Sequence, residues 1–397
     1  MDITAKQIRS YRLHAHHLDK KIPTDNIIDA AGVCGLQNTP PGSWETSMFN
    51  RLESCTLQAL NDALYNEKIL IQAWSYRGVP VVFPTGQSDI FLTPLMAREG
   101  EQPWIYTQGI TGALDYLQMS FDDLLVYLKK TIHYLDSHTV KSKEALDQIL
   151  ADLIQDDLPK DKQKLWCDPS MYGNPDKQTV GGAAVSFLLR PCSYNALVVF
   201  GERQGSSPTF TSFRNWTGHA PIGIPDADKV LVRKFLHCYG PARADHFMSW
   251  LGCSSQQAHR LWNTIADEMV PIQIEGKTCY MLSADMDNLR SAEGDEEKLI
   301  LLGAHDPYLD MRDRTIILED KSFHKDVWKY VANPGVVLKG GRIIGTWKIK
   351  TIGKKLDLSV MTWETITFAE QQILKQLAEE YAAFRMMNIR NCIMESI

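Results

Sequence analysis

The sequence predicts an α+β fold in which groups of helices are each followed by a β-hairpin, with a strand-rich region at the end of the chain. Three observations support this prediction. Helical periodicity gives way to short β-rich runs at several points. The clearest group, residues 225–293, reads as three helices followed by two strands around a glycine turn. After Gly294 the composition changes to strands separated by glycines.

The first group, residues 1–120, combines helices with one hairpin. Helical patterns are expected over residues 3–19, 25–36, 44–52 and 56–68. The run ILIQAWSYRGVPVVFP, which begins at Ile69, is rich in β-formers on both sides of Arg77-Gly78, so it predicts a hairpin. Helices followed by one hairpin are the arrangement of a winged helix.

The same order recurs twice. In residues 121–224, a helical stretch over 121–155 and a helix-like run precede two strands with a polar turn at 203–207. In residues 225–293, one helix is closed by Gly240 and the next opens on Pro241. The third helix follows an N-cap serine, and two strands then flank Gly276. This third group is a helix-turn-helix with a hairpin appended.

The last region, residues 294–397, contains LILLGAHDPYLDMRDRTIIL and GVVLKGGRIIGTWKIKTIGKKLDLSVMTWETI. Glycine turns between these strands predict a small curved sheet or β-barrel-like domain, and a helix is expected over 368–387. The chain is therefore expected to form four domains: winged helices at 1–120, 121–224 and 225–293, and the β-barrel-like domain at 294–397.

The composition fits a globular protein, because 44% of the 397 residues are hydrophobic and 23% are charged. No apolar run approaches a membrane span, and the N-terminus lacks the apolar core of a signal peptide, so we expect a cytoplasmic location. The eight cysteines form no C-x-x-C pair. His14, His16 and His17 have the spacing of a solvated helix face, so neither a metal nor another cofactor is expected.

The net charge of −6 argues mildly against a nucleic-acid partner. The distribution of charge argues differently, because KGGRIIGTWKIKTIGKK, from Lys339 to Lys355, has six basic residues and no acid. Solvated faces of both signs would explain this equally well.

The stretch GLQNTPP places three polar side chains where a helix must stop. Gln37, Asn38 and Thr39 precede Pro40-Pro41, and two prolines followed by Gly42 prevent the helix from continuing. Such a run is usually a turn whose side chains cap the helix end. The alternative is that the turn holds these groups for chemistry.

Five separated strings resemble the AlkZ/YcaQ-like family of bacterial winged-helix DNA glycosylases. In chain order they are GLQNTPP, QAWSYRGVPVVFP, YGPARADHFMSWLG, LLGAHDPYLDMRDR and PGVVLKGGRIIGTWK. The resemblance implies three tandem winged helices on a β-barrel, forming a C-shaped cleft for double-stranded DNA. It also implies hydrolysis of the N-glycosidic bond of alkylated purines, in some members including interstrand crosslinks.

The family's catalytic motif is Gln–hydrophobic–Gln, or Gln–hydrophobic–Asp. Gln37 matches its first position, whereas Asn38 and Thr39 depart from it. The resemblance therefore makes Gln37, Asn38 and Thr39 the catalytic candidates, with Glu45 as a further carboxylate. A cationic base leaves without protonation, so a neutral amide that orients water is chemically adequate. Because Thr39 replaces the second Gln or Asp, a non-catalytic DNA-binding protein is the alternative.

Several residues are candidates for DNA contacts: Arg77, Arg312, Arg314, Arg342, Trp347, Lys348 and Lys350. Arg77 sits at a hairpin tip, where it either probes a groove or only forms the turn. Arg312 and Arg314 either bind phosphates or form a core ion pair with Asp306. The other candidates are Arg342, Trp347, Lys348 and Lys350. They either combine positive charge with an aromatic ring for DNA binding, or belong to a sheet whose outer positions are basic. Three wings around one duplex suggest a monomer.

Overall fold

The computed structural model describes residues 3–172, 176 and 178–396. Contacts divide the chain into two compact units, and both are assembled from separate segments. The first unit contains Met1–Ala63, Val232–Trp250 and Trp262–Ile397. The second unit contains Leu64–Leu231 and Leu251–Leu261. The expected division into four domains remains a prediction.

The N-terminal helices of the first unit begin where side chains can cap them. Thr4 and Gln7 form a reciprocal capping box at the first helix, and Thr56 caps the fourth. The elements are α1 (Ala5–Ala15), α2 (Ile27–Gly32), β1 (Leu36–Gln37), α3 (Ser43–Arg51) and α4 (Leu57–Asn61). The helix expected over 25–36 was placed too long, because α2 ends at Gly32 and Gly35 adopts a left-handed φ of 73°.

The third group has the element order that the sequence predicts. It contains α12 (Ala227–Tyr239), α13 (Ala244–Leu251), α14 (Ser255–Trp262), β7 (Met269–Ile274) and β8 (Lys277–Leu282). The two strands pair antiparallel, from Met269 opposite Leu282 to Ile274 opposite Lys277. Gly276, with φ 74°, supplies the turn between them.

In the second unit, the two expected hairpins belong to one sheet. Its strands are ordered β3-β2-β5-β6-β4 and pair antiparallel. Their bounds are β2 (Leu70–Trp74), β3 (Pro80–Pro84), β4 (Val140–Lys141), β5 (Val199–Gln204) and β6 (Ser207–Thr211). The sequence predicted both hairpins but not their pairing with each other.

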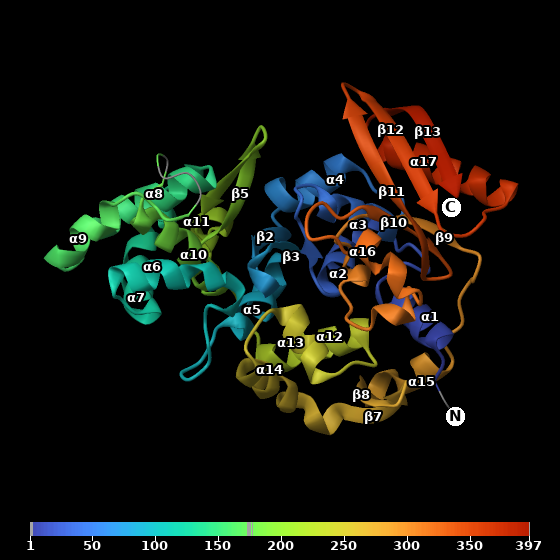
Figure 1. Cartoon of the computed structure of the whole chain (residues 1–397), viewed down its shortest axis with the longest axis horizontal. Coiled ribbons are helices and arrows are strands. Elements are labelled where there is room, and N and C mark those ends of the chain that lie inside the picture. The colour runs from blue at the N-terminus through green and yellow to red at the C-terminus, as the bar shows by residue number, and fades with distance from the viewer. Residues whose placement is uncertain (1–2, 173–175, 177, 397) are drawn as a thin grey trace. The chain divides into compact units, whose positions relative to one another are not determined.

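Helices pack beside this sheet, and several of them share an apolar core with it (Figure 1). The helices are α5 (Ser88–Leu92), α6 (Thr111–Leu117), α7 (Phe121–Thr131), α8 (Lys143–Gln155), α9 (Lys160–Cys167), α10 (Val180–Tyr194) and α11 (Phe213–Thr217). Within the core, Trp74 of β2 stacks on Phe210 of β6, with ring centroids 5.3 Å apart. This contact joins the two hairpins through side chains as well as through the backbone.

The C-terminal part of the first unit is an open five-stranded sheet, ordered β13-β12-β11-β10-β9. The expected β-barrel-like domain is corrected accordingly, because the described strands leave β13 and β9 as edges and do not close. The bounds are β9 (Leu299–Leu302), β10 (Gly335–Lys339), β11 (Arg342–Ile352), β12 (Lys355–Thr362) and β13 (Asn388–Ser396). The short helix α15 (Met286–Arg290) precedes β9 in the sequence, and α16 (His324–Val327) lies between β9 and β10.

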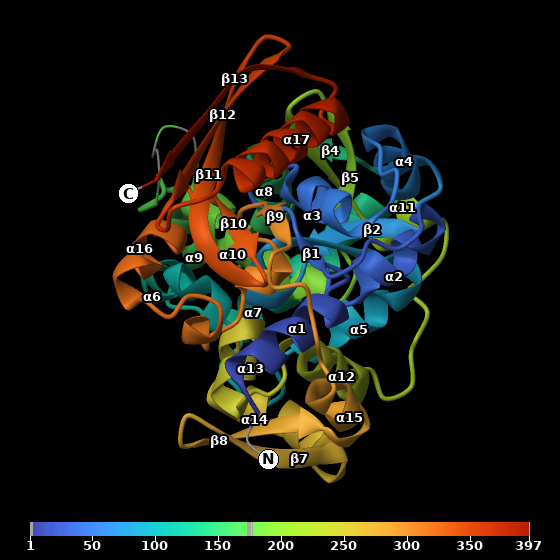
Figure 2. The same cartoon turned by 90° about the vertical axis from the view of Figure 1, so that its right-hand side faces the viewer.

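One long helix covers a face of this sheet. α17 (Phe368–Phe384) contacts β13 and β9, and Figure 2 shows it lying along the strands. Because α17 returns the chain across the sheet, β13 pairs parallel to β12. The helix was expected from the sequence, but β13 was not. No helix in the described parts of the chain is both long and apolar enough to cross a membrane.

Two buried arginines fasten the segment after β9 to the N-terminal helices. Arg51 of α3 makes a two-pronged contact with Asp306, at 2.7 and 2.8 Å, and both side chains are at most 1% exposed. Arg12 of α1 binds Asp313 in the same way, at 3.0 and 2.7 Å. The suggested core ion pair of Asp306 therefore exists, but its partner is Arg51, not Arg312 or Arg314.

Candidate active site and nucleic-acid interface

Gln37, Asn38 and Thr39 run from the last residue of β1 into a tight turn before α3, inside the first unit. The Asn38 Oδ1 atom accepts a hydrogen bond from the Gly42 backbone at 2.7 Å, and the Ser43 hydroxyl donates to the Gln37 carbonyl at 2.8 Å. Gly42 has φ 92°, which a residue with a side chain adopts only with strain. These contacts close the turn around Pro40-Pro41.

The three polar side chains differ in exposure. Gln37 and Asn38 are each 6% exposed, whereas Thr39 is exposed. The Gln37 amide nitrogen lies 3.4 Å from the Thr39 carbonyl oxygen, at the long end for a hydrogen bond. The Asn38 side chain holds the turn together, so the reading that these residues stabilise a helix break is correct for Asn38.

An ion pair lies directly against this turn. Glu45, in the first turn of α3, pairs with Arg385 at the end of α17. A Cβ atom added to Gly42 would lie 3.4 Å from both side chains, which shows how closely the pair approaches the turn. Sequence reasoning named Glu45 but missed Arg385, because a single arginine after a helix carries no local signal.

Arg312 and Arg314 line a basic cleft of about 310 Å³ between the β7–β8 hairpin and the segment before β10. Arg314 stacks on the ring of Trp328 at 4.3 Å, and burial, followed by the neighbouring charge of Arg312, lowers its pKa. The lining contains five lysines and arginines and two carboxylates: Arg243, Lys277, Arg312, Arg314, Lys321, Glu275 and Asp313. Since Asp313 is already paired with Arg12, the cleft offers excess positive charge to an anion.

The candidates on β11 point in different directions, because successive residues of a strand face opposite sides of the sheet. Trp347 is 4% exposed and its indole N–H donates to the Leu302 carbonyl at 2.8 Å. It is therefore a core residue here, and the expectation that it contacts DNA is corrected. Lys348 and Lys350 are exposed, and Arg342 lies 3.5 Å from Glu364.

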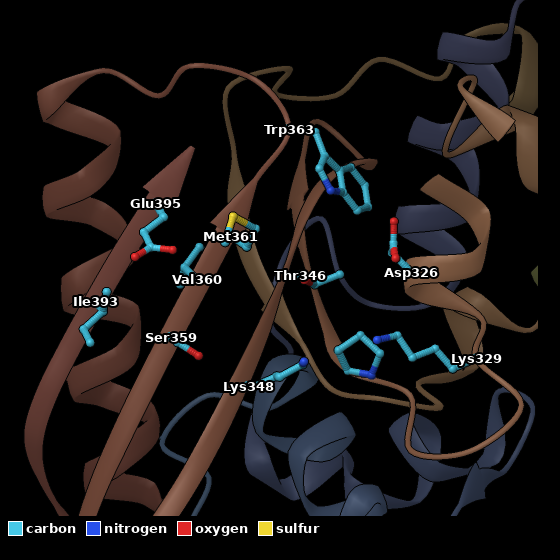
Figure 3. A pocket seen from close by; sticks show the side chains of 11 residues that line it. Asp326, Lys329, Thr346, Lys348, Ser359, Val360, Met361, Trp363, Ile393 and Glu395 are labelled. Carbon is cyan, nitrogen blue, oxygen red and sulfur yellow. The ribbon is translucent and has the colours of Figure 1, made fainter. Parts of the chain in front are cut away.

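Figure 3 shows a second cavity, of about 490 Å³, along β11, β12 and β13. Lys348 reaches it from β11, and Lys329 reaches it from the segment after α16. Two acids, Asp326 and Glu395, also line it, so its charge is mixed. The aromatic ring that lines this cavity is Trp363, a residue not among the candidates from the sequence, and Figure 3 shows it at the opposite end of the cavity from Lys348.

Arg77 belongs to the second unit, in the turn between β2 and β3. Its backbone has φ 57°, and its guanidinium lies 5.0 Å from the centre of the Tyr76 ring. A Cβ atom added to Gly252, in the same unit, would lie 2.8 Å from the Arg77 Cα atom. Arg77 is thus partly buried in a packed turn, and the six other DNA-contact candidates lie in the first unit.

The three N-terminal histidines do not share one solvated face. His14 is exposed and its ring approaches Asp19 at 2.9 Å, but His16 is completely buried. Its neighbours include Cys34 and Cys238, both also buried. The expectation of a solvated histidine face was wrong for His16.

Comparison with known proteins gives three concordant similarities. The model of the DNA glycosylase AlkZ-like family matches residues 30–384. The interstrand DNA cross-link repair glycosylase of Streptomyces sahachiroi is 21% identical over 363 residues, which cover 88% of this chain and 89% of the relative. The solved structure of Streptomyces sahachiroi DNA glycosylase AlkZ has a TM-score of 0.78 and 17% identity, with 100% of both chains covered.

Proposed function

This chain belongs to the AlkZ-like family of DNA glycosylases, hydrolases of N-glycosyl bonds in DNA, and from that premise we propose that it releases cationic alkylated purines from duplex DNA. The observation that carries the proposal is the closed turn that begins with Gln37 and approaches the Glu45–Arg385 ion pair at Gly42. By extension from the name of the Streptomyces relative, interstrand crosslinks are proposed as a second substrate.

The chemistry of the turn favours a cationic leaving group. Alkylation at N7 or N3 gives the purine a positive charge, so its departure requires no general acid. The amide oxygen of Gln37 can accept a hydrogen bond from the attacking water and stabilise the positive charge that develops on the sugar. Glu45 is engaged by Arg385, so its role in the proposal is to position that guanidinium near the substrate backbone.

We further propose that the chain works as a monomer, with winged-helix units near 1–120, 121–224 and 225–293. The order of α12, α13, α14, β7 and β8 supports the third unit. The shared sheet supports the first two as a pair joined through their hairpins. One chain with three hairpins offers several wings to one duplex, without the two-fold symmetry that a dimeric regulator uses.

The decisive test of this function compares charged and neutral leaving bases. Single-turnover release of 7-methylguanine from duplex DNA is expected to proceed, whereas uracil and hypoxanthine should remain uncleaved, because the turn lacks a side chain placed to protonate a neutral base. Release can be followed by strand cleavage at the resulting abasic sites. Comparable release of uracil would contradict the proposal. Duplex binding with no release of any base would favour the non-catalytic alternative.

The proposed DNA contacts lie on the basic cleft, on Arg342, Lys348 and Lys350, and on Arg77. For the two exposed lysines we expect that Lys348→Ala with Lys350→Ala weakens duplex binding and flattens its salt dependence. Each lost phosphate contact should reduce the slope of log affinity against log salt by about 0.9, because fewer counterions are released. Fluorescence anisotropy over a salt series measures both quantities.

A matched control removes two exposed lysines from another surface. Lys160 and Lys164 of α9 are both exposed, so replacing them with alanine changes the net charge equally. Their loss should leave the slope nearly unchanged. If both double variants show the same slope as the wild type, Lys348 and Lys350 make no phosphate contacts.

A further inference from the structure

Three metal-binding side chains meet in the interior of the first unit. His16 follows α1, Cys34 follows α2, and Cys238 belongs to α12. Their exposed fractions are 0%, 2% and 0%. One ligand atom from each lies within 4.8 Å of the other two. Because the two cysteines are distant in sequence, no C-x-x-C spacing could reveal this cluster.

The imidazole of His16 lacks a strong partner for either nitrogen. Its Nδ1 atom lies 4.0 Å from the Cys34 sulfur, the outer limit for a hydrogen bond to sulfur. Its Nε2 atom is buried and makes no hydrogen bond within the described residues. A fully buried polar group without good partners destabilises the fold, and an ion that has not been accounted for is one of its common explanations.

The two sulfurs of the cluster would bind a cation as thiolates. A divalent cation favours this form, because loss of the thiol proton accompanies metal binding.

We propose that His16, Cys34 and Cys238 bind a thiophilic divalent cation, with zinc the ion that suits the donor set best. Two thiolates and one imidazole are ligands that zinc commonly takes in proteins. Two thiolates also balance the charge of a divalent ion, which leaves a neutral centre in a fully buried place. The Tyr239 hydroxyl lies 3.8 Å from the Cys34 sulfur and donates a hydrogen bond to the Pro307 carbonyl at 3.1 Å.

The separation between Cys34 and His16 needs only a small contraction to bind such an ion. Tetrahedral zinc with ordinary bond lengths separates a sulfur and a nitrogen ligand by about 3.6 Å. The corresponding separation between Cys34 and His16 is 4.0 Å. A disulfide between Cys34 and Cys238 is the competing use of the two sulfurs, but it would leave the imidazole of His16 unpartnered.

A metal ion at this position would also fix part of the candidate active site, an inference that rests on the proposed function. Cys34 lies three residues before Gln37, on the segment that leads into β1. A bound ion would join that segment to α1 and α12. It would thus fix the start of the turn that carries the polar triplet, without touching the substrate. The three protein ligands are positioning residues in this account.

The experiment measures bound metal directly. Because the cluster is buried, the ion must enter during folding, so the full chain is expressed in zinc-supplemented medium and purified without chelators. Elemental analysis should find about one zinc per wild-type chain. Cys34→Ala and Cys238→Ala should each lose most of it. Cys192→Ala is the matched control, because Cys192 is equally buried but lies in the second unit, and it should retain the metal.

A second measurement needs no variant, so it remains informative if a substitution prevents folding. Wild-type protein produced with cobalt in place of zinc should show the near-ultraviolet absorption of a thiolate–cobalt bond. Absence of metal and of this band in the wild type would overturn the proposal. So would zinc content unaffected by loss of Cys34 and Cys238, or a Cys34–Cys238 disulfide found by non-reducing peptide mapping.

These readouts keep the two proposals separate. A metal-free wild-type chain that still releases 7-methylguanine would overturn the zinc centre and leave the proposed function intact. A zinc-containing chain that releases no base would support the zinc centre and overturn the proposed function.

Discussion

Gln37→Ala is expected to slow single-turnover release of 7-methylguanine by roughly one to three orders of magnitude, the scale of losing one preorganised polar group. Gln37 is 6% exposed, and its backbone carbonyl accepts a hydrogen bond from the Ser43 hydroxyl, which fixes the backbone at the start of the turn. Removal of the side-chain amide leaves the attacking water and the developing sugar cation without that dipole. Rates should be measured with enzyme in excess over a DNA duplex carrying one lesion.

The control for this variant is Gln58→Ala. Gln58 lies exposed on α4 in the same unit, so the same atoms are removed away from the turn. Because Gln37 is buried, the thermal stability of its variant is measured alongside the rate, and losing one hydrogen bond should cost about 0.5–1.5 kcal/mol. Identical release rates for Gln37→Ala, Gln58→Ala and the wild type would exclude a catalytic role for Gln37.

Thr39→Gln tests the departure from the family's motif in the opposite direction. Thr39 is exposed, so the longer side chain can be accommodated without repacking the core. Restoring the second amide should accelerate release by about tenfold or more, since one placed polar group contributes on that scale. An unchanged rate would mean that the hydroxyl at this position already suffices, or that the position has no part in the reaction.

Asp306→Ala is expected to destabilise the first unit by about 3–5 kcal/mol, because it leaves the guanidinium of Arg51 buried without its counterion. Arg51 is 1% exposed, and its two-pronged contact with Asp306 ties α3 to the segment after β9. Urea unfolding at neutral pH, followed by tryptophan fluorescence, measures the loss.

The double variant Arg51→Met with Asp306→Leu should recover most of that stability, because neither charge is then left in the core. An exposed pair provides the comparison: Lys130→Ala with Asp157→Ala should change the free energy of unfolding by less than about 1 kcal/mol. If Asp306→Ala proves no more costly than the exposed pair, the buried contact contributes little to the fold.

The same contact gives the stability a defined dependence on pH. Burial alone would raise the pKa of Asp306, but Arg51 outweighs it, so the folded-state pKa lies below the ordinary value of about 3.9. The stabilisation is therefore complete above that ordinary value. It is lost as the pH falls through the folded-state pKa.

Local signals in the sequence predicted the helices and hairpins whose ends are marked by residues with strong preferences. Gly276 forms the third hairpin turn, and Thr56 begins α4 because its hydroxyl can cap the helix. Pairings between segments that are far apart in the chain have no comparable local signal in the sequence. The shared sheet of the two hairpins and the parallel strand β13 depend on partners far along the chain, which periodicity cannot identify.

The same distinction holds at the candidate site. The prolines after Thr39 and the family resemblance predicted where the polar turn lies, and the structure places it there. Neither indicated that Asn38 holds the turn or that Arg385 lies beside it, since both facts depend on three-dimensional packing. Trp347 was misjudged for a related reason: its basic neighbours suggested a surface, whereas strand alternation turns its ring into the core.

The contact of Arg385 with Glu45 also affects the order in which the protein matures during its synthesis. The two residues are 340 positions apart, so at translation rates of about 5–20 residues per second the arginine is made roughly 20 to 70 s after the glutamate. The turn with Gln37 leaves the ribosome early, but it lacks the neighbouring guanidinium until α17 has emerged. A nascent chain therefore lacks the Glu45–Arg385 contact beside this turn for most of its time on the ribosome.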